Sequence, residues 1–497
     1  MMRASGVLLP TSSIPSNYGI GCFSKEAYMF VDQLVAGGQK YWQILPLGPT
    51  GYGDSPYQSF STFAGNPYFI DLEEFIQLGL LSAEECQQCD WGGSESYVDY
   101  EKMYQSRFPL LRKAFSRFDC EKEEDFAEFV KEQSFWLEDY CLYMAIKNDL
   151  NGIGWNEWPA ELKNREPDAM ADAKERLAEE IQFYRFQQYW FYHQWSRLKK
   201  YANDRGVEII GDLPIYVAFD GADAWANPSL FQFDEENQPV AVAGCPPDAF
   251  SATGQLWGNP LYDWEYHKKT GYVWWIQRMS HCMKLYDKVR IDHFRGFDEY
   301  WAIPYGDETA ENGAWEKGPG LELFTILESR IPNLDVIAED LGFLTDSVLK
   351  LLADSGFPGM KVLQFAFDWS ENSTYLTHKY DKNCVVYTGT HDNETSKGWY
   401  EKLDDHDACF VREYTNCQGK NLDDCVWDFI RLAMSSVADL AVIPLQDYLC
   451  LGNEARMNTP STLGDNWKWR LTKNQLTDET LKRMRAMTKL YGRIQEC

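Results

Sequence analysis

Long apolar runs, a framework of spaced cysteines and an excess of basic residues are all missing from this chain. No run of about 18 apolar residues occurs, so we expect no membrane-spanning helix. Lys and Arg number 47 against 76 Asp and Glu, for a formal charge of −29. That charge repels phosphate backbones and anionic lipid, which argues against nucleic-acid and membrane partners but is compatible with a neutral substrate.

The sequence also lacks the signs of export and of a zinc site. The chain opens with a short strand-like segment, not with a charged region followed by the apolar stretch of a signal peptide. The 13 cysteines, an odd number, fit reduced thiols and predict a cytoplasmic protein. Cys86 and Cys89 form a CxxC with no second pair at zinc-site spacing, so we expect no metal and no other cofactor.

Apolar residues are plentiful, and they are grouped in a way that predicts the fold. Short apolar runs with β-branched residues recur, mostly separated by segments long enough for a helix, and each ends in Pro, Gly, Asp or another turn-forming or polar residue. Runs that are apolar on both faces are typical of parallel strands buried between helices. We therefore predict an α/β protein with one catalytic (β/α)8 barrel spanning 1–497. The eight runs are 6–9, 41–45, 207–211, 288–292, 335–339, 361–365, 384–388 and 440–445.

Two of the gaps between these runs are far longer than a crossover helix needs. We expect inserted, mainly helical subdomains at about 55–165, after the second strand, and about 213–285, after the third. A stripe of large apolar residues at helical spacing from Leu177 to Leu198 predicts a packing helix that leads into the third strand.

Acidic residues stand at the ends of four predicted strands, where a barrel carries its active site. They are Asp212, Asp292, Glu339 and Asp392. Each alone could be a helix N-cap or a loop salt bridge, but four together favour a site. Arg290 lies two residues before Asp292, on the same strand face, and can keep that carboxylate ionised.

Glu339, by contrast, follows an apolar run, and such surroundings can raise the pKa of a carboxyl group toward that of a general acid. An acid beside an anion is the arrangement that glycosidic bond cleavage requires. His293 and His391 adjoin two of the aspartates, which leaves metal binding as an alternative. The chain has neither HxH nor HExxH, so carboxylate chemistry is the favoured interpretation.

Aromatic and amide side chains occur in loops near the predicted cleft. Tyr57 lies in GYGDSPYQ, and Trp257 and Asn259 lie in TGQLWGNP. Aromatic rings stack on the apolar faces of sugars while amides bind the hydroxyl groups, although loops of this composition also pack structurally.

Six sequence blocks in order, and two more near the C-terminus, closely resemble the 4-α-glucanotransferases, also called amylomaltases or disproportionating enzymes, of glycoside hydrolase family 77. They are 53–61 (GDSPYQSFS), 211–217 (GDLPIYV), 247–260 (PDAFSATGQLWGNP), 289–296 (VRIDHFRG), 337–342 (IAEDLG), 390–395 (THDNET), 456–460 (RMNTP) and 466–470 (NWKWR). The resemblance implies an α-amylase-type barrel without a C-terminal β domain.

The resemblance also implies the residue roles. Asp292 would be the nucleophile, Glu339 the acid/base and Asp392 a third catalytic carboxylate that grips hydroxyls of the distorted sugar. The implied substrate-binding residues are Tyr57, Asp212, Trp257, Arg290, His293, Asp368, His391 and Asn458. One departure is Ala249, where many members carry an aromatic residue in a loop over the cleft.

The expected activity is transfer of α-1,4-glucan segments from a malto-oligosaccharide donor to the 4-hydroxyl of an acceptor glucan or glucose, with retention of configuration. Two alternatives stay open at this point. One is a retaining hydrolase of the α-amylase kind, and the other is an inactive glucan-binding protein.

Overall fold

A computed structural model describes residues 3–51, 53–247, 251–342, 344–367, 373–418 and 420–494. Eight parallel strands form one sheet in the order β10-β11-β12-β1-β2-β3-β6-β9. The two outer strands meet through a hydrogen bond from Ala338 N–H to Pro358 O (3.0 Å), which brings the sheet close to a closed barrel. The strands are β1 Ala4–Leu8, β2 Tyr41–Gln43, β3 Glu208–Pro214, β6 Lys288–Asp292, β9 Val336–Ala338, β10 Gly359–Val362, β11 Cys384–Tyr387 and β12 Leu440–Pro444.

Each of the eight predicted apolar runs overlaps one of these strands, so the barrel prediction is confirmed. Along most of these strands, alternate apolar residues enter two different cores, as the two-residue period of a strand requires. On β12, for example, Leu440 and Val442 pack inside the barrel, whereas Ala441 and Ile443 pack against the surrounding helices.

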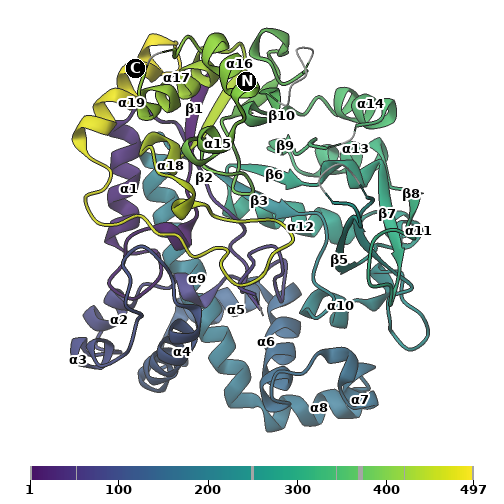
Figure 1. Ribbon diagram of the computed structural model, residues 1–497. Coiled ribbons are helices and arrows are strands. Elements are labelled where there is room, and N and C mark those ends of the chain that lie inside the picture. Colours follow the sequence, from purple (N-terminus) through teal and green to yellow (C-terminus); the bar gives the residue numbers. More distant parts are fainter. Residues whose placement is uncertain are drawn as a thin grey trace.

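Helices cover the outside of the barrel (Figure 1). Among the described residues, an α-helix lies in every connection between consecutive barrel strands except that from β10 to β11, which holds the 3-10 turns Leu363–Phe367 and Thr377–Lys379. The connecting and C-terminal helices are α1 Lys25–Ala36, α9 Ala178–Asp204, α12 Val273–Leu285, α13 Leu321–Arg330, α14 Asp346–Ser355, α15 Ser396–Lys402, α16 Asp405–Tyr414, α17 Leu422–Ser435, α18 Leu445–Tyr448 and α19 Asp478–Leu490.

The segment between β2 and β3 is helical. Its helices gather at one end of the molecule, and the long α9 returns from them to the barrel (Figure 1). The predicted apolar stripe lies on α9, where Ile181, Phe191 and Trp195 are buried. The other helices of this segment are α2 Leu72–Gln77, α3 Ala83–Gln87, α4 Tyr100–Arg117, α5 Glu124–Glu132, α6 Ser134–Asp149, α7 Ala160–Lys163 and α8 Pro167–Arg176.

The segment after β3 contains two strands, β4 and β5, in addition to its helices. These two strands join β7 and β8, which lie in the connection from β6 to β9, in a four-stranded antiparallel sheet of order β5-β4-β7-β8 beside the barrel (Figure 1). This sheet brings the Trp257 side of the cleft into place. Its strands are β4 Ala241–Cys245, β5 Gln255–Pro260, β7 Glu299–Pro304 and β8 Ala314–Lys317, and the short helices nearby are α10 Ala222–Ala226 and α11 Trp264–Lys269.

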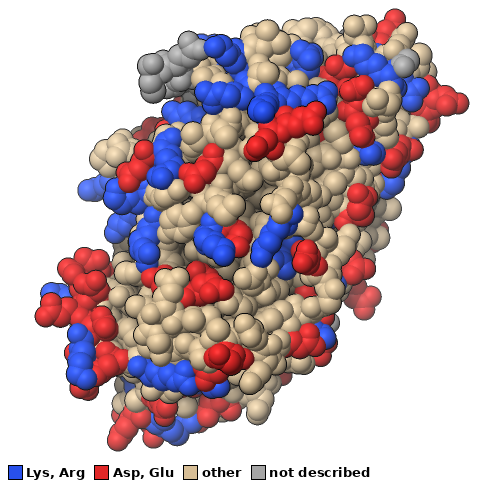
Figure 2. Space-filling model, turned by 90° about the vertical axis from the view of Figure 1, so that its left-hand side faces the viewer, with Lys and Arg blue, Asp and Glu red and all other residues tan. Residues whose placement is uncertain are grey.

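The two ends of the described chain lie close together, since Arg493 Nη1 donates to Ala4 O (2.8 Å). On the face shown in Figure 2, Lys and Arg are interspersed with Asp and Glu. Within the described ranges, no helix is both long and apolar enough to cross a bilayer.

Candidate active site

Strand register brings the predicted acidic residues to one end of the barrel. Asp212 is the register partner of Arg290 on the neighbouring strand, and Ile291 is the partner of Ala338. Asp292 and Glu339 are the residues that follow Ile291 and Ala338, and they therefore lie at the same level of two adjacent strands. Val289 and Ile291 pack outward against the helices. Because strand residues alternate between the two faces, Arg290 and Asp292 lie on the face toward the inside of the barrel.

Arg290 binds two carboxylates at once. Its Nη1 donates to both oxygens of Asp212 at 2.7 Å, and its Nη2 lies 3.1 Å from Asp292 Oδ1. The Asp212 side chain is fully buried, whereas 29% of the Asp292 side chain remains exposed. Asp212 thus holds the cation in place, and Asp292 keeps an accessible oxygen for a reaction.

Glu339 is held by the backbone. The N–H of His293 donates to Glu339 Oε2 (2.7 Å), and the N–H of Leu341 donates to Oε1 (2.8 Å). His293 has a φ of 54°, in the left-handed region that is uncommon for a residue with a side chain. This conformation is part of the turn that aims the His293 N–H at the carboxylate, and such strain is found most often at functional sites.

The two carboxyl groups differ in their surroundings. Burial raises the pKa of Glu339 to about 7; Arg290 opposes that rise, and the charge of Asp292 adds to it. Burial also raises the pKa of Asp292, to about 6, and Arg290 counters it. Because Arg290 contacts Asp292 directly, Asp292 is the more acidic of the pair. Near neutral pH the site holds an anion next to a carboxyl group that can carry a proton.

The loop after β11 supplies Asp392 and His391. His391 Nε2 lies 3.3 Å from Asp392 Oδ2, and Asn458 Nδ2 donates to Asp392 Oδ1 (2.6 Å). Burial would raise the pKa of Asp392, but His391 and Asn458 hold it below its ordinary value. The Asp392 side chain is 44% exposed, so this anion is accessible from solvent.

Tyr57 joins the two halves of the site. Its hydroxyl donates to Asp212 Oδ2 (2.7 Å) and lies 2.9 Å from His391 Nε2, and its ring stacks on His391 with centroids 5.2 Å apart. Trp467 packs beside both rings, at 5.8 Å from Tyr57 and 5.9 Å from His391. Trp467 belongs to the block 466–470 of the family resemblance, but nothing local to that block predicts these distant contacts.

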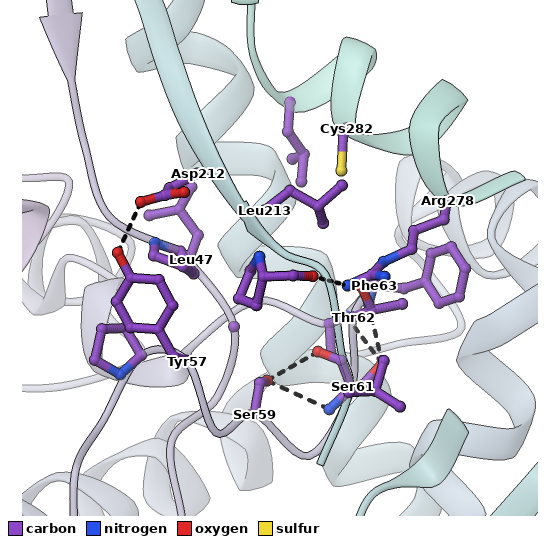
Figure 3. Close-up of a pocket in the computed structure, with 18 of the residues that line it drawn as sticks. Leu47, Tyr57, Ser59, Ser61, Thr62, Phe63, Asp212, Leu213, Arg278 and Cys282 are labelled. Atoms are coloured by element: carbon purple, nitrogen blue, oxygen red, sulfur yellow. Dashed lines mark hydrogen bonds between the residues drawn. The ribbon is translucent and has the colours of Figure 1, made fainter. Parts of the chain in front are cut away.

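A cavity of about 50 Å³ lies behind Tyr57 (Figure 3). Tyr57 and Asp212 border one side of it and Arg278 the other. The buried Arg278 donates to Thr62 Oγ1 (2.7 Å) and to the backbone oxygen of Pro214 (2.6 Å). These bonds tie the loop that carries Tyr57 to the end of β3.

Trp257 reaches the site from the antiparallel sheet. Its ring meets the His293 ring edge-on with centroids 4.8 Å apart. Burial and the charge of Arg295 lower the pKa of His293 to about 4, so this histidine is neutral at physiological pH. Asp368 and Ala249 lie outside the described residues.

The described side chains that could share a metal ion are Asp404, His406 and Asp407 of the α16 region. Neither His293 nor His391 belongs to that set. The barrel mouth combines a partly exposed carboxylate, a carboxyl group with a raised pKa and several hydrogen-bonding groups, which is the kind of arrangement that glycosidic bond exchange requires.

Comparisons with known proteins agree with this chemistry. The family model described as 4-alpha-glucanotransferase matches residues 9–477. A 4-alpha-glucanotransferase of Streptococcus pneumoniae is 50% identical over 99% of this chain and 98% of its own length, and one of Clostridium butyricum is 47% identical over 97% and 99%. The solved amylomaltase from Streptococcus agalactiae in complex with acarbose is similar with a TM-score of 0.96 and 41% identity, over 99% of this chain and all of that one.

Proposed function

The chain belongs to the 4-alpha-glucanotransferase family and is an enzyme of that activity, and on this premise we propose a retaining mechanism with Asp292 as nucleophile and Glu339 as acid/base. The observation that carries the proposal is the unequal pair at the barrel mouth. Asp292 is partly exposed and bound by a cation, whereas Glu339 is only 9% exposed and has the higher pKa.

In the first step Asp292 attacks the anomeric carbon of the donor glucan and forms a glycosyl ester. Glu339 gives its proton to the departing 4-oxygen, and the donor bond breaks. In the second step Glu339 removes the proton from the 4-hydroxyl of an acceptor glucan or glucose, whose oxygen displaces Asp292 from the same carbon. Two inversions retain the α configuration.

The remaining predicted residues have complementary roles in the proposal. Asp392, which is anionic and half-exposed, grips hydroxyls of the distorted sugar, and His391 and Asn458 hold it in place. Trp257 and His293, whose rings are in contact, contribute ring surface and hydrogen bonds. Asp368 is proposed as a further donor-side residue on the family resemblance alone.

Asp212 and Arg290 contribute to substrate binding through other residues, because both are buried. Asp212 fixes the Tyr57 hydroxyl, and Arg290 fixes Asp292. Malto-oligosaccharides and α-1,4-glucans are the proposed substrates, and a neutral polyol suits a site whose charges are already paired within the protein. We also place the enzyme in the cytoplasm, which the buried free thiols of Cys22, Cys141 and Cys282 support.

Incubation of the purified protein with maltotriose tests the activity. We expect a ladder of longer oligomers together with glucose, resolved by chain length. Glucose and maltose alone would favour a hydrolase, and unchanged maltotriose would favour a binding protein. A parallel incubation with Asp292→Asn identifies any activity from a contaminating enzyme.

A further inference from the structure

A buried carboxylate below the active-site loop has no part in the chemistry described so far. Asp447 lies on α18, just after β12, and is 1% exposed. No cation among the described residues forms an ion pair with it. A buried charge without a counter-ion is costly unless hydrogen bonds compensate it, so its partners are informative.

In the part of the chain that the structure describes, the Asp447 carboxylate accepts three hydrogen bonds, all from Thr388 and Ser396. Thr388 Oγ1 donates to Oδ2 (2.6 Å), Ser396 Oγ donates to Oδ2 (2.7 Å), and Ser396 N–H donates to Oδ1 (2.7 Å). Both partners are fully buried. Hydrogen bonds to an ionised acceptor are about twice as strong as neutral ones, so these are strong ties.

The two partners stand at the two ends of one loop. Thr388 directly follows β11, and Ser396 is the first residue of α15. His391 and Asp392 lie between them. The Asp447 carboxylate thus binds both the residue after β11 and the first residue of α15. It links the two ends of the loop that carries Asp392.

Other hydrogen bonds also hold this loop. Near its ends, Gln364 N–H donates to Thr388 O (3.3 Å) and Gly398 N–H donates to Thr395 Oγ1 (3.1 Å), and further bonds hold its middle. Arg456 Nη2 donates to Asp392 O (2.8 Å), and Asn458 N–H donates to His391 O (3.1 Å). Within the loop, Thr390 donates to the Asn393 side chain. The Asp447 carboxylate accepts three bonds from the two ends of the loop, so the height and tilt of the Asp392 carboxylate depend on Asp447 as well as on these other contacts.

We propose that Asp447 is a positioning residue of the active site, which sets the place of Asp392 by clamping Thr388 and Ser396. The proposal rests on the proposed role of Asp392. Loss of the clamp lets the loop shift, and displacement of a catalytic group by about 1 Å costs roughly a hundredfold in rate.

The test measures kcat and KM for maltotriose with Asp447→Asn, which keeps the volume but removes the charge. We expect kcat to fall about 10- to 100-fold with KM within about threefold, because the affected interaction forms mainly in the transition state. Unchanged kcat per folded molecule would overturn the proposal.

Asp287→Asn is the matched control. Asp287 also accepts three hydrogen bonds, from Ile209 N–H (2.8 Å), Asn203 Nδ2 (2.8 Å) and Lys199 Nζ (2.7 Å), but it lies at the opposite, amino-terminal end of the barrel. We expect this variant to lose stability and keep its kcat. If it loses kcat as Asp447→Asn does, the effect is general loosening and the proposal fails.

Milder variants keep the test valid if Asp447→Asn does not fold. Thr388→Val removes one bond at constant shape, whereas Thr388→Ser keeps the hydroxyl. We expect kcat to fall for the first and to stay near wild type for the second. Equal kcat for the two variants would contradict the clamp.

A double-mutant cycle with Asp392→Asn shows whether Asp447 acts through Asp392. We expect the double variant to be no slower than Asp392→Asn alone, because a carboxylate that is absent cannot be misplaced. Additive losses would overturn the proposal. Wild-type activity of Asp392→Asn would instead refute the proposed function of Asp392, whatever Asp447 does.

Discussion

The two ends of β6 each carry a buried basic residue, but the two residues have different roles. Lys288 and Arg290 are both basic, both buried and two residues apart on the same face of the strand. Lys288, at the amino end, pairs with Asp335, whose side chain is 49% exposed. Arg290, toward the carboxyl end, binds the fully buried Asp212 and also Asp292.

The carboxylates at the two ends differ in how much of their hydrogen-bonding capacity remains free after their contacts within the protein. At the amino end the carboxylates of Asp287 and Asp335 serve the fold, since they hold strand, helix and lysine groups. At the carboxyl end Asp292 and Asp392 keep open sides toward solvent after their protein contacts are made. Spare hydrogen-bonding and nucleophilic capacity at a fixed position is what distinguishes a reactive carboxylate from a structural one. The predictions below test that distinction.

The largest effect is expected for Asp292→Asn. The amide fills nearly the same volume but cannot form the glycosyl ester, so both transfer and hydrolysis should fall by at least about 10⁴-fold. Product formation from maltotriose measures the loss, and circular dichroism checks the fold. Activity within tenfold of wild type would remove Asp292 from the nucleophile role.

A smaller loss, of about 10²- to 10⁴-fold with glucans, is expected for Glu339→Gln, which removes the proton donor. With α-maltotriosyl fluoride the leaving group needs no proton, so Asp292 can still react, and the adduct should accumulate because no base activates the acceptor. Intact mass spectrometry should show one added maltotriosyl unit, mapped to Asp292.

Azide should discharge that adduct, because it needs no deprotonation, and should give a glycosyl azide of α configuration. A β product, or label on another carboxylate, would contradict the double displacement.

The pH dependence should change activity about tenfold per unit outside a narrow optimum. Asp292 must be ionised, and its pKa is raised to about 6, so kcat/KM falls as the pH drops below that value. Glu339 must be protonated, and its pKa is raised to about 7, so kcat/KM falls as the pH rises above it. Initial rates between pH 4 and 9 should give a bell. A basic limb that persists in Glu339→Gln with the fluoride donor would assign it to another group.

The sequence was sufficient for the barrel and for its reactive end. Most of the barrel strands are runs of mainly apolar residues, and strand parity and register place Asp212, Asp292 and Glu339 together, as the rule for barrel active sites predicts. The assigned chemical roles, and the division into a barrel with insertions at 55–165 and 213–285, stay predictions.

The antiparallel sheet could not be predicted in the same way. In β8, Ala314–Lys317, every residue is exposed, and β5, Gln255–Pro260, is partly exposed, so neither has the apolar run that identifies a strand. Trp467 packs on Tyr57 and His391, which lie far from it in the sequence, and has a φ of 65° that no local pattern predicts. These features depend on tertiary contacts, which single-sequence patterns do not contain.

The smallest effect is expected for Lys288→Met, which separates the two ends of β6 most directly. Methionine fills the space of the buried lysine stem, and Asp335 stays hydrated when its partner is lost, so no buried charge is left unpaired. We expect kcat/KM within about twofold of wild type and an unfolding midpoint within about 3 °C. Arg290→Met is the matched contrast, since it leaves the fully buried Asp212 without its cation and should cost about 3–5 kcal/mol of stability and most of the activity. Thermal unfolding and maltotriose kinetics on the two variants decide the matter. If both lose activity equally, the charge of the strand as a whole sustains catalysis, and the distinction between its two ends is wrong.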